Sequence, residues 1–484
     1  MLTRMFYWKQ KKDLIEILVN NIFKILLIFI LVTNCSFQKN SKFWTSEKIK
    51  DVNQENIEEV SNKEKALDLE TNPKLKISLN KKSINKSFLN NLNNNQGRIN
   101  YDGDLKNISK FKFSKIENFY QYSPEISFEN KNIIFFDNKG TVLKFDSRSN
   151  LIWKKNYYSK VEKQHNPILF FANNKKILII ADNITKYYAL DIKTGELLWK
   201  KNNTAPFNSQ IKIYKDKFFI VDYKNTLRAF SIKNGKEIWN VKTENSLIRT
   251  QKKLSIVIVD DKIYFNNSLG DVNAVDAGSG ELIWQVPTQS NIIYDENFYL
   301  KTSDLIASKD TLFFSNNKNE FFSIDLNTGS INWKIKINSS LRPTLIENYI
   351  FTVSIEGYLI VVDKNSGNII RATDLFKESR INSKKISKIG FGILDNPDLN
   401  PLDRVLGKKT NKKITNKLKY NPTGFIVGKN NIYLATDRGR LFIIDIATGI
   451  TNKILKIDSG KILRPLVLDK NLFIITDSSI IKLN

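Results

Sequence analysis

Short apolar segments alternate with polar turns along most of this chain, with a period of roughly 40 residues. The repeat is clearest in LDIKTGELLW at Leu190–Trp199, FSIKNGKEIW at Phe230–Trp239, VDAGSGELIW at Val275–Trp284 and IDLNTGSINW at Ile324–Trp333. The segments before each copy are rich in Ile, Val, Phe and Tyr with a period near two, which is typical of strands. The chain is therefore predicted to repeat one small β-unit.

Each copy contains the same predicted turn. A polar residue opens it, and a glycine follows four positions later in six of seven copies, where it supplies the positive φ that a hairpin with a bulge requires. In the first copy Asn150 takes the glycine position, and we expect it to adopt the left-handed conformation. The opening residues are Asp146, Asp191, Ser231, Asp276, Asp325, Asp363 and Asp445, and the glycines are Gly195, Gly235, Gly280, Gly329, Gly367 and Gly449.

Two alternating strands precede each turn, as in Ile133–Asp137 followed by Val142–Asp146. A proline upstream of this pair marks the start of a third strand, because proline is tolerated at the first residue of a strand. With the strand after the turn, the unit has four antiparallel strands, and such units arranged radially form a β-propeller. The marking prolines are Pro124, Pro167, Pro206, Pro343, Pro422 and Pro465.

The number of blades depends on how the chain ends are used. Leu463–Asn484 contains Leu-Arg-Pro and two apolar strands but stops before its turn, so its unit lacks a last strand. Phe111–Ile116, before the first repeat, could supply that strand. The prediction is an all-β, eight-bladed propeller of four-stranded antiparallel blades, closed by pairing of N- and C-terminal strands. A seven-bladed ring with a separate C-terminal hairpin is the alternative.

A tryptophan closes five of the copies at one fixed position, and Arg371 and Lys453 occupy that position in the last two. A large aromatic residue at a repeated position is best explained by packing in or between blades. Stacking on a ligand is the less favoured interpretation. The five residues are Trp153, Trp199, Trp239, Trp284 and Trp333.

Composition limits the function classes. The 484 residues are 41% hydrophobic, enough for the core of one large ring, and the net charge is +27. The basic residues are spread through every loop without a recognition helix or an aromatic platform, so we expect no nucleic-acid partner and favour anionic membrane surfaces or acidic partners. Cys35 is the only cysteine and His165 the only histidine, which excludes an intrachain disulfide and a Cys/His metal cluster. We expect His165 to be a loop residue.

The amino terminus resembles a secretory signal. Basic residues such as Lys9 and Lys24 precede the apolar run Ile25–Val32, which is too short for a comfortable membrane span and lies just before Cys35. We therefore predict a lipoprotein-type signal peptide over residues 1–34 and lipidation of Cys35. Asn34 departs from the small residue usual before such a cysteine, and an incidental cysteine in an uncleaved anchor is the alternative.

The rest of the chain divides into a linker and the propeller. Residues 35–107 are rich in Asn, Lys, Ser and Glu and are predicted to be a disordered tether. The propeller is predicted over residues 108–484, with an inserted loop at 376–421. Three acidic residues in this loop could bind calcium, but their spacing matches no calcium loop, so we expect a solvated loop and no metal. These residues are Asp395, Asp398 and Asp403.

The phrase D-x-x-T-G-x-x-x-W, as in Asp191–Trp199 and Asp325–Trp333, resembles the repeat of pyrroloquinoline-quinone-type propellers. With a lipoprotein-like start and eight units, the chain from Cys35 onward resembles the propeller lipoproteins of the outer-membrane barrel-assembly machinery. The resemblance implies a non-enzymatic scaffold without cofactor, lipid-anchored at the periplasmic face of the outer membrane, that assists insertion of outer-membrane proteins. Its implied partners are a β-barrel assembly subunit and unfolded outer-membrane strands.

Two alternatives remain open. A quinone-dependent dehydrogenase of the same superfamily would need an acidic base, a calcium ion and usually a vicinal cysteine pair, and this chain has one cysteine. The second alternative is a different periplasmic propeller scaffold. In the resembled family, a hydrophobic pair followed by Arg between the third and fourth turn phrases contacts the barrel subunit. Leu247, Ile248 and Arg249 match that place, and Asp304 is the nearest counterpart of the family's acidic contact.

Overall fold

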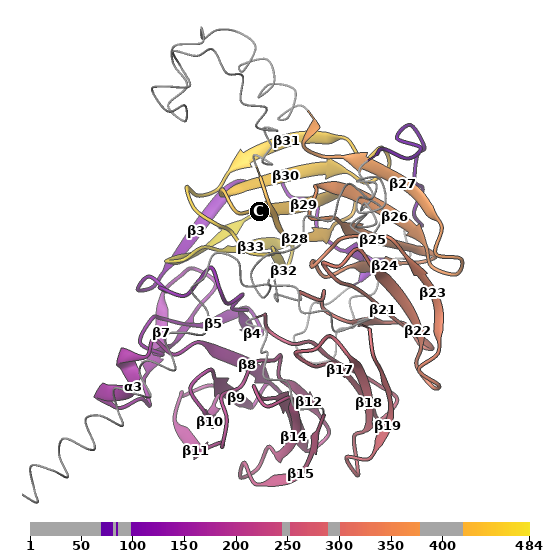
Figure 1. The fold of residues 1–484 in the computed structure, drawn as a ribbon. Coiled ribbons are helices and arrows are strands. Elements are labelled where there is room, and N and C mark those ends of the chain that lie inside the picture. Colours follow the sequence, from indigo (N-terminus) through magenta and orange to yellow (C-terminus); the bar gives the residue numbers. More distant parts are fainter. Residues whose placement is uncertain (1–68, 81–83, 86–97, 244–251, 289–300, 378–419) are drawn as a thin grey trace, which may run out of the picture. The chain divides into compact units, whose positions relative to one another are not determined.

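The structure is a computed structural model that describes residues 69–80, 84–85, 98–243, 252–288, 301–377 and 420–484. The chain divides into two units, Met1–Glu64 and Lys65–Asn484, and all described residues belong to the second. Within that unit, eight four-stranded antiparallel sheets surround a common centre, as Figure 1 shows. The predicted eight-bladed propeller is confirmed, and the seven-bladed alternative is wrong.

In seven of the blades, the four strands are consecutive in the sequence and run from the innermost strand to the outermost. Blade 1 consists of β4 (Ser127–Glu129), β5 (Asn132–Phe136), β6 (Val142–Phe145) and β7 (Leu151–Lys155); blade 2 of β8 (Leu169–Asn173), β9 (Ile177–Asp182), β10 (Lys186–Asp191) and β11 (Leu197–Asn202); blade 3 of β12 (Lys212–Tyr214), β13 (Lys217–Val221), β14 (Thr226–Ser231) and β15 (Glu237–Lys242); and blade 4 of β16 (Ile256–Val259), β17 (Lys262–Asn266), β18 (Val272–Asp276) and β19 (Leu282–Val286).

Blades 5 to 7 continue in the same order. Blade 5 consists of β20 (Ile306–Ala307), β21 (Thr311–Ser315), β22 (Phe321–Asp325) and β23 (Ile331–Ile335); blade 6 of β24 (Thr344–Ile346), β25 (Tyr349–Val353), β26 (Tyr358–Asp363) and β27 (Ile369–Asp374); and blade 7 of β28 (Pro422–Val427), β29 (Asn431–Thr436), β30 (Arg440–Asp445) and β31 (Thr451–Lys456). Residues 378–419, which make up most of the predicted insertion, lie outside the described residues.

Blade 8 joins the two ends of the propeller. It consists of β32 (Leu466–Leu468), β33 (Asn471–Ile475) and β34 (Ser479–Leu483), with β3 (Asn107–Lys112) as its outermost strand. The pairing of β3 with β34 is antiparallel, with Lys110 opposite Ile481. Closure by terminal strands is therefore confirmed, but the closing strand begins four residues before the predicted Phe111–Ile116 and ends at Lys112.

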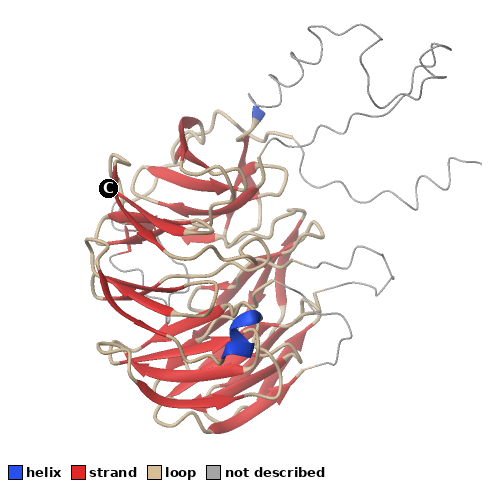
Figure 2. Ribbon diagram, turned by 90° about the vertical axis from the view of Figure 1, so that its left-hand side faces the viewer, coloured by secondary structure: helices blue, strands red, loops and turns tan. Residues whose placement is uncertain are grey.

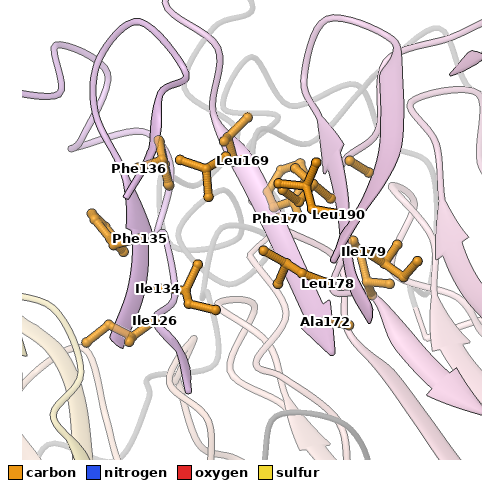
Figure 3. Packing of buried hydrophobic residues seen from close by; sticks show 14 of the residues in the cluster. Ile126, Ile134, Phe135, Phe136, Leu169, Phe170, Ala172, Leu178, Ile179 and Leu190 are labelled. Atoms are coloured by element: carbon orange, nitrogen blue, oxygen red, sulfur yellow. The ribbon is translucent and has the colours of Figure 1, made fainter. Parts of the chain in front are cut away.

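The strands differ in how they are buried. Inner strands such as β5 are buried at consecutive positions, because neighbouring blades cover both faces of each sheet. Figure 3 shows Ile134 and Phe135 on opposite sides of β5, with Ile134 toward Leu178 of blade 2. An alternation of partly buried and exposed residues appears in the outermost strands, as in β15. The period of two expected for every strand therefore describes only part of each blade.

The repeated turns have the predicted geometry. In blade 2, Asp191 Oδ1 accepts hydrogen bonds from the backbone N–H groups of Lys193 and Thr194, both at 2.9 Å. Gly195 has a φ of 74°, and the register shifts between Ala189 and Leu190, as a bulge requires.

The first copy of the turn differs from the prediction. Ser149, with a φ of 68°, takes the left-handed conformation in place of Asn150. This turn has one residue fewer between its aspartate and the next strand, so the bend falls one position earlier. The Asn150 side chain instead donates to Asp146 Oδ2 at 2.9 Å.

The tryptophans pack between blades, as predicted. Trp239 of blade 3 lies on Gly280 of blade 4, so closely that a Cβ at Gly280 would stand 2.6 Å from the ring. Its Nε1 donates to the Gly278 carbonyl at 3.0 Å. Blade 6 carries Arg371 at this position, and its guanidinium donates to the Ile446 carbonyl of blade 7 at 3.0 Å. The residues at this position thus join each of blades 1 to 6 to the next blade.

Part of the predicted tether lies on the propeller. Thr71 pairs with Ala372 at the outer edge of β27, and Ile77 is buried and donates to the Ala447 carbonyl at 2.9 Å. Tyr101 is also buried, with its ring 5.1 Å from that of Tyr433. The prediction of disorder is therefore wrong for residues 69–80 and 98–107. A polar composition did not reveal the few apolar side chains that the propeller buries.

Helix is scarce in the described chain, as Figure 2 shows. The helix α3 (Lys160–Gln164) is one short turn with a capping box between Ser159 and Glu162. Two further short strands, β1 (Ile84–Asn85) and β2 (Arg98–Ile99), pair in parallel. In the described residues, no helix has the length and apolar character needed to cross a membrane.

Candidate functional site

Charged side chains gather where the innermost strands of the blades begin. In Figure 1 these strands, among them β4, β8, β12, β24 and β32, lie nearest the centre of the ring. The residues are Glu125 before β4, Lys212 at the start of β12, Lys252 and Lys253 before β16, Asp304 before β20, Arg342 before β24 and Arg464 before β32. We call these seven residues the inner-ring cluster.

Hydrogen bonds in this cluster join blades that are not neighbours. Lys253 of blade 4 forms an ion pair with Glu125 of blade 1 at 2.8 Å and donates to the Ser123 carbonyl at 3.2 Å. Gln210, before blade 3, donates to Asp304 Oδ2 of blade 5 at 3.1 Å. Such contacts span the ring, so they place the cluster at its centre.

Lys252 connects a further set of blades. Its ammonium group donates to the Ser340 carbonyl before blade 6, at 2.8 Å, and to the Thr302 carbonyl before blade 5. Lys252 and Lys253 are adjacent in the chain but reach across the ring to different blades. This pair therefore ties blade 4 to blades 1, 5 and 6.

Positive charge dominates the inner-ring cluster, with five cationic side chains and two carboxylates. Burial lowers the pKa of Lys212 to about 8, and the neighbouring Arg342 adds to the effect. Burial also lowers the pKa of Lys252 to about 8, and Asp304 partly opposes this. Burial alone would raise the pKa of Asp304, but the cations around it, led by Lys252 and Arg342, hold it below its usual value.

Water reaches one side of the cluster. The Glu125 side chain keeps 48% of its surface exposed. Burial favours a raised pKa for Glu125, and Lys253 outweighs it, so the carboxylate stays charged. Lys212, in contrast, is only 5% exposed. The cluster thus combines an accessible rim with a buried cation.

The chemistry available here is electrostatic. In the ranges that the structure covers, no group of three or more His, Cys, Asp and Glu side chains could hold a metal ion. His165 is exposed at the C-terminal cap of α3, as expected for a loop residue. A ring of lysine and arginine side chains can bind an anion or an acidic partner group.

The structure describes only some of the predicted site residues. Asp304 belongs to the inner-ring cluster. Leu247, Ile248, Arg249 and Cys35 lie outside the described residues, as do Asp395, Asp398 and Asp403 of the insertion. The segment that contains Leu247 leads directly into Lys252 and Lys253 in the sequence, so it adjoins the cluster along the chain.

The sequence interpretation missed the other six members of the cluster. One signal was available, because Leu341-Arg342-Pro343 and Leu463-Arg464-Pro465 repeat the same phrase before an innermost strand. Several blades have a charged residue just before their innermost strand. These residues can be assigned to the centre of the ring only when the circular arrangement of the blades is known. Spacing along the chain does not show which of them meet.

The outermost strands form a second surface. Within its own sheet, each of these described strands pairs with a single neighbour, and several expose apolar residues. Thr71 pairs with the outer edge of β27 at Ala372, so one edge already accepts an extended segment of the chain itself. The exposed residues include Leu151, Ile152, Leu197, Leu198, Ile238, Leu282, Ile283, Ile331 and Ile454.

Three comparisons relate the chain to known proteins. A family model described as "Outer membrane protein assembly factor BamB" matches residues 138–373. The outer membrane protein assembly factor BamB of Shewanella oneidensis is 22% identical over 324 residues, which are 61% of this chain and 79% of that protein.

Among solved structures, BamB from Moraxella catarrhalis has a TM-score of 0.59 at 14% identity, over 78% of this chain and 99% of that one. The quinohemoprotein alcohol dehydrogenase from Comamonas testosteroni has a TM-score of 0.55 at 11% identity, over 80% of this chain and 78% of that one. At these identities both likenesses show the propeller fold and do not distinguish a scaffold from an enzyme.

Proposed function

We propose that this chain is a BamB-type β-propeller of the pyrroloquinoline-quinone-type repeat superfamily. On this premise, it is a non-enzymatic scaffold in outer-membrane β-barrel assembly. The observation that carries the proposal is the match of residues 138–373 to the BamB family model. The quinone-enzyme alternative has only a likeness of fold in its favour.

The proposed scaffold contacts a β-barrel assembly subunit through the face that carries the inner-ring cluster. Leu247, Ile248 and Arg249 are the proposed contact residues, and Asp304 contributes from the cluster. Cations hold Asp304 ionised, so it offers a fixed negative charge. Arginine is a frequent hot spot of protein interfaces, which supports the choice of Arg249.

Unfolded outer-membrane strands are the proposed second partner. An extended segment can add to an exposed strand edge by β-augmentation. The outermost strands offer such edges beside exposed apolar residues such as Leu198 and Ile283. In the proposed role, the propeller holds a client strand briefly while the barrel subunit inserts it.

The proposed location is the periplasmic face of the outer membrane, with a lipid anchor on Cys35. Several acyl chains on one cysteine give stable attachment, since each buried methylene contributes about 0.8 kcal/mol. Cys35→Ala should move the protein to the soluble periplasmic fraction and abolish its labelling by radioactive palmitate. Unchanged membrane retention and labelling would remove the anchor from the proposal.

The scaffold role is tested by affinity isolation from solubilised outer membranes followed by mass spectrometry. We expect recovery of a large β-barrel subunit with the unaltered protein and its loss with Arg249→Glu, at unchanged thermal stability. Lys200→Glu, with the same charge change on the exposed outer strand β11, is the control and should retain the subunit. Absence of any barrel subunit, together with quinone absorbance and dye-linked alcohol oxidation, would favour the dehydrogenase.

A further inference from the structure

Residues 70–77 lie on blade 6, although they precede the first blade in the sequence; we call them the docked segment. Figure 1 shows this segment in indigo beside β27. Thr71 and Ala372 exchange both backbone hydrogen bonds, at 3.1 Å and 2.9 Å, as in an antiparallel strand pair. The Asn72 side chain donates to the Ile370 carbonyl at 3.2 Å. The docked segment therefore adds to the outer edge of blade 6.

A carboxylate completes the contact with this edge. Glu70 Oε1 accepts from the Asp374 backbone N–H at 3.3 Å, and Glu70 Oε2 pairs with the Lys377 ammonium group at 2.8 Å. The docked segment thus bonds backbone groups at alternate positions of β27, which are Ile370, Ala372 and Asp374. An added strand would use the same groups in β-augmentation.

Beyond this edge, the docked segment turns and inserts one apolar side chain between blades 6 and 7. The turn Asn72–Leu75 is closed by a backbone hydrogen bond of 3.0 Å, and Pro73 within it has no N–H to continue the strand pairing. Ile77 then joins the hydrophobic core, with 4% of its surface exposed, and donates to the Ala447 carbonyl at 2.9 Å. It is the one buried side chain in residues 69–80. Release of the segment therefore disrupts far less packing than unfolding a blade.

The edge of β27 is better suited to accept an extended segment than the edges of most other blades. Exposed lysines lie on six of the other seven described outermost strands, and charged side chains on an edge oppose pairing with another chain. These six strands are β3, β7, β11, β15, β23 and β31. In β27, Arg371 is buried and Asp374 is the other charged residue. Without the docked segment, β27 would lack this protection.

We propose that the outer edge of β27 and the apolar site that holds Ile77 together bind an extended segment of a partner polypeptide, and that residues 70–77 are an internal ligand of this docking site. The partner segment pairs one residue with Ala372, presents a carboxylate to Lys377 and places a branched aliphatic side chain where Ile77 lies. An attached ligand competes at a high effective concentration. A partner must therefore match several of these contacts to displace the docked segment.

A fluorescent peptide of residues 69–80 tests the docking site, with the purified full-length protein in detergent. Ile77→Asp in the protein should release the docked segment, because it places a charge in the hydrophobic core, and trypsin should then cleave faster after Lys74 and Lys76. Fluorescence anisotropy should show saturable peptide binding to this variant, and binding at least about tenfold weaker to the unaltered protein. Ser78→Asp adds the same charge at the exposed next position and should behave as the unaltered protein does.

Substitutions in the peptide identify the contacts that it makes. Thr71→Pro removes the N–H that donates to the Ala372 carbonyl, and Ile77→Asp removes the apolar side chain, so each should weaken binding to the released protein at least about tenfold. Ser78→Asp in the peptide should leave binding unchanged. The bound peptide should also slow amide hydrogen exchange in β27.

The unaltered protein gives a test that needs no variant of the chain. An excess of the peptide, with both lysines replaced by glutamine so that trypsin does not cut it, should displace the docked segment and speed cleavage after Lys74. The same peptide with Ile77→Asp should have no such effect.

Three results would each overturn the proposal: no peptide binding to the Ile77→Asp protein, binding that both peptide substitutions leave unchanged, or slow trypsin cleavage in the Ile77→Asp protein. Equal binding by the unaltered and Ile77→Asp proteins also overturns it. All these measurements use the isolated protein, so their outcome is independent of the proposed role in barrel assembly.

Discussion

At the scale of single residues, the repeated turn links a glycine of one blade to a tryptophan of the blade before it. Gly235, Gly280, Gly329 and Gly367 all have positive φ values and lie against the ring of a preceding tryptophan. The glycine therefore meets two requirements at once, a left-handed backbone and a flat surface for an aromatic ring. A position that had to meet only one of these requirements would accept more residue types.

Gly280→Ala should lower the free energy of unfolding by roughly 2 to 4 kcal/mol, because the new methyl group meets the Trp239 ring at 2.6 Å in a backbone conformation that alanine avoids. Gly278→Ala in the same turn is the control. The φ of Gly278 is not positive, and the atom nearest to an added Cβ would be Asp276 Oδ1, at 3.2 Å. Urea unfolding measures both. Equal losses in the two variants would contradict the assigned role of Gly280.

The lowered pKa of Lys212 predicts how the free energy of unfolding depends on pH. Its pKa is about 8 in the folded protein against an ordinary 10.5, so between these values the unfolded chain binds more protons than the folded chain. The free energy of unfolding should therefore rise as the pH increases from 8 toward 10.5, by on the order of 2 kcal/mol from this residue. Below pH 8 the full penalty of the buried charge is present.

Urea unfolding at pH 7.5 and pH 9.5, in chloride without phosphate or sulfate, checks this prediction. Lys212→Met should be more stable than the unaltered protein at pH 7.5 and should lose a large part of the rise toward pH 9.5. Lys252 has a similarly lowered pKa, so some of the rise should remain. Lys200→Met should keep the whole rise. Loss of the rise in this control would mean that the effect is not specific to Lys212.

At the scale of elements, the described residues 69–80 and 98–106 form a strap on blades 6 to 8. Arg371 holds the first part of it. Fully buried in β27, Arg371 donates from Nη1 to the Leu75 carbonyl of the strap at 3.1 Å and to the Ala447 carbonyl, and from Nη2 to the Ile446 carbonyl. A tryptophan at this position has one N–H donor and could not satisfy three carbonyls. The departure from the repeat thus has a structural reason.

Arg371→Met should destabilise the propeller by roughly 3 kcal/mol and release the strap, because buried carbonyls lose their donor. Limited trypsin digestion with mass spectrometry should then show faster cleavage after the exposed Lys74 and Lys76. Lys453→Met changes the same repeat position in blade 7, where the side chain is exposed, and should leave the cleavage rate unchanged. Slow cleavage in both variants would mean that other contacts hold the strap.

At the scale of the whole molecule, the ring is closed by strand pairing between its ends and by side chains at its centre. Phe111 of the closing strand β3 is fully buried, with its ring 5.7 Å from that of Phe145 and 6.4 Å from that of Phe473. It therefore joins blade 8 to blade 1. The inner-ring cluster adds contacts between blades that are not neighbours in the ring, such as the pair of Lys253 and Glu125.

Phe111→Ala should lower the free energy of unfolding by about 3 to 4 kcal/mol, since it opens a cavity where the ring closes. Ile108→Ala in the same strand removes an apolar side chain that is 49% exposed and should cost less than about 1 kcal/mol. Thermal unfolding monitored by circular dichroism compares the two. A small loss for Phe111→Ala would indicate that β3 contributes little to closure.

The sequence by itself determined the four-stranded blade and its turn, and it favoured eight repeats over seven. These features depend on residues close together in the chain, such as Asp191 and Gly195, so their spacing is visible without a structure. The position of Trp239 was predictable for the same reason. Ring closure was also predictable, because Leu463–Asn484 lacks one strand and β3 precedes the first repeat.

The tertiary structure alone decided which distant residues meet. Lys253 and Glu125 are far apart in the sequence, and only the circular arrangement of the blades brings them together at the ring centre. The strap was missed for a related reason, since its composition is polar and a few buried contacts, such as those of Ile77 and Tyr101, fix it. Local patterns specify strands and turns through short-range sterics and hydrogen bonds. The inner-ring cluster depends on electrostatic contacts across the ring, which sequence spacing does not encode.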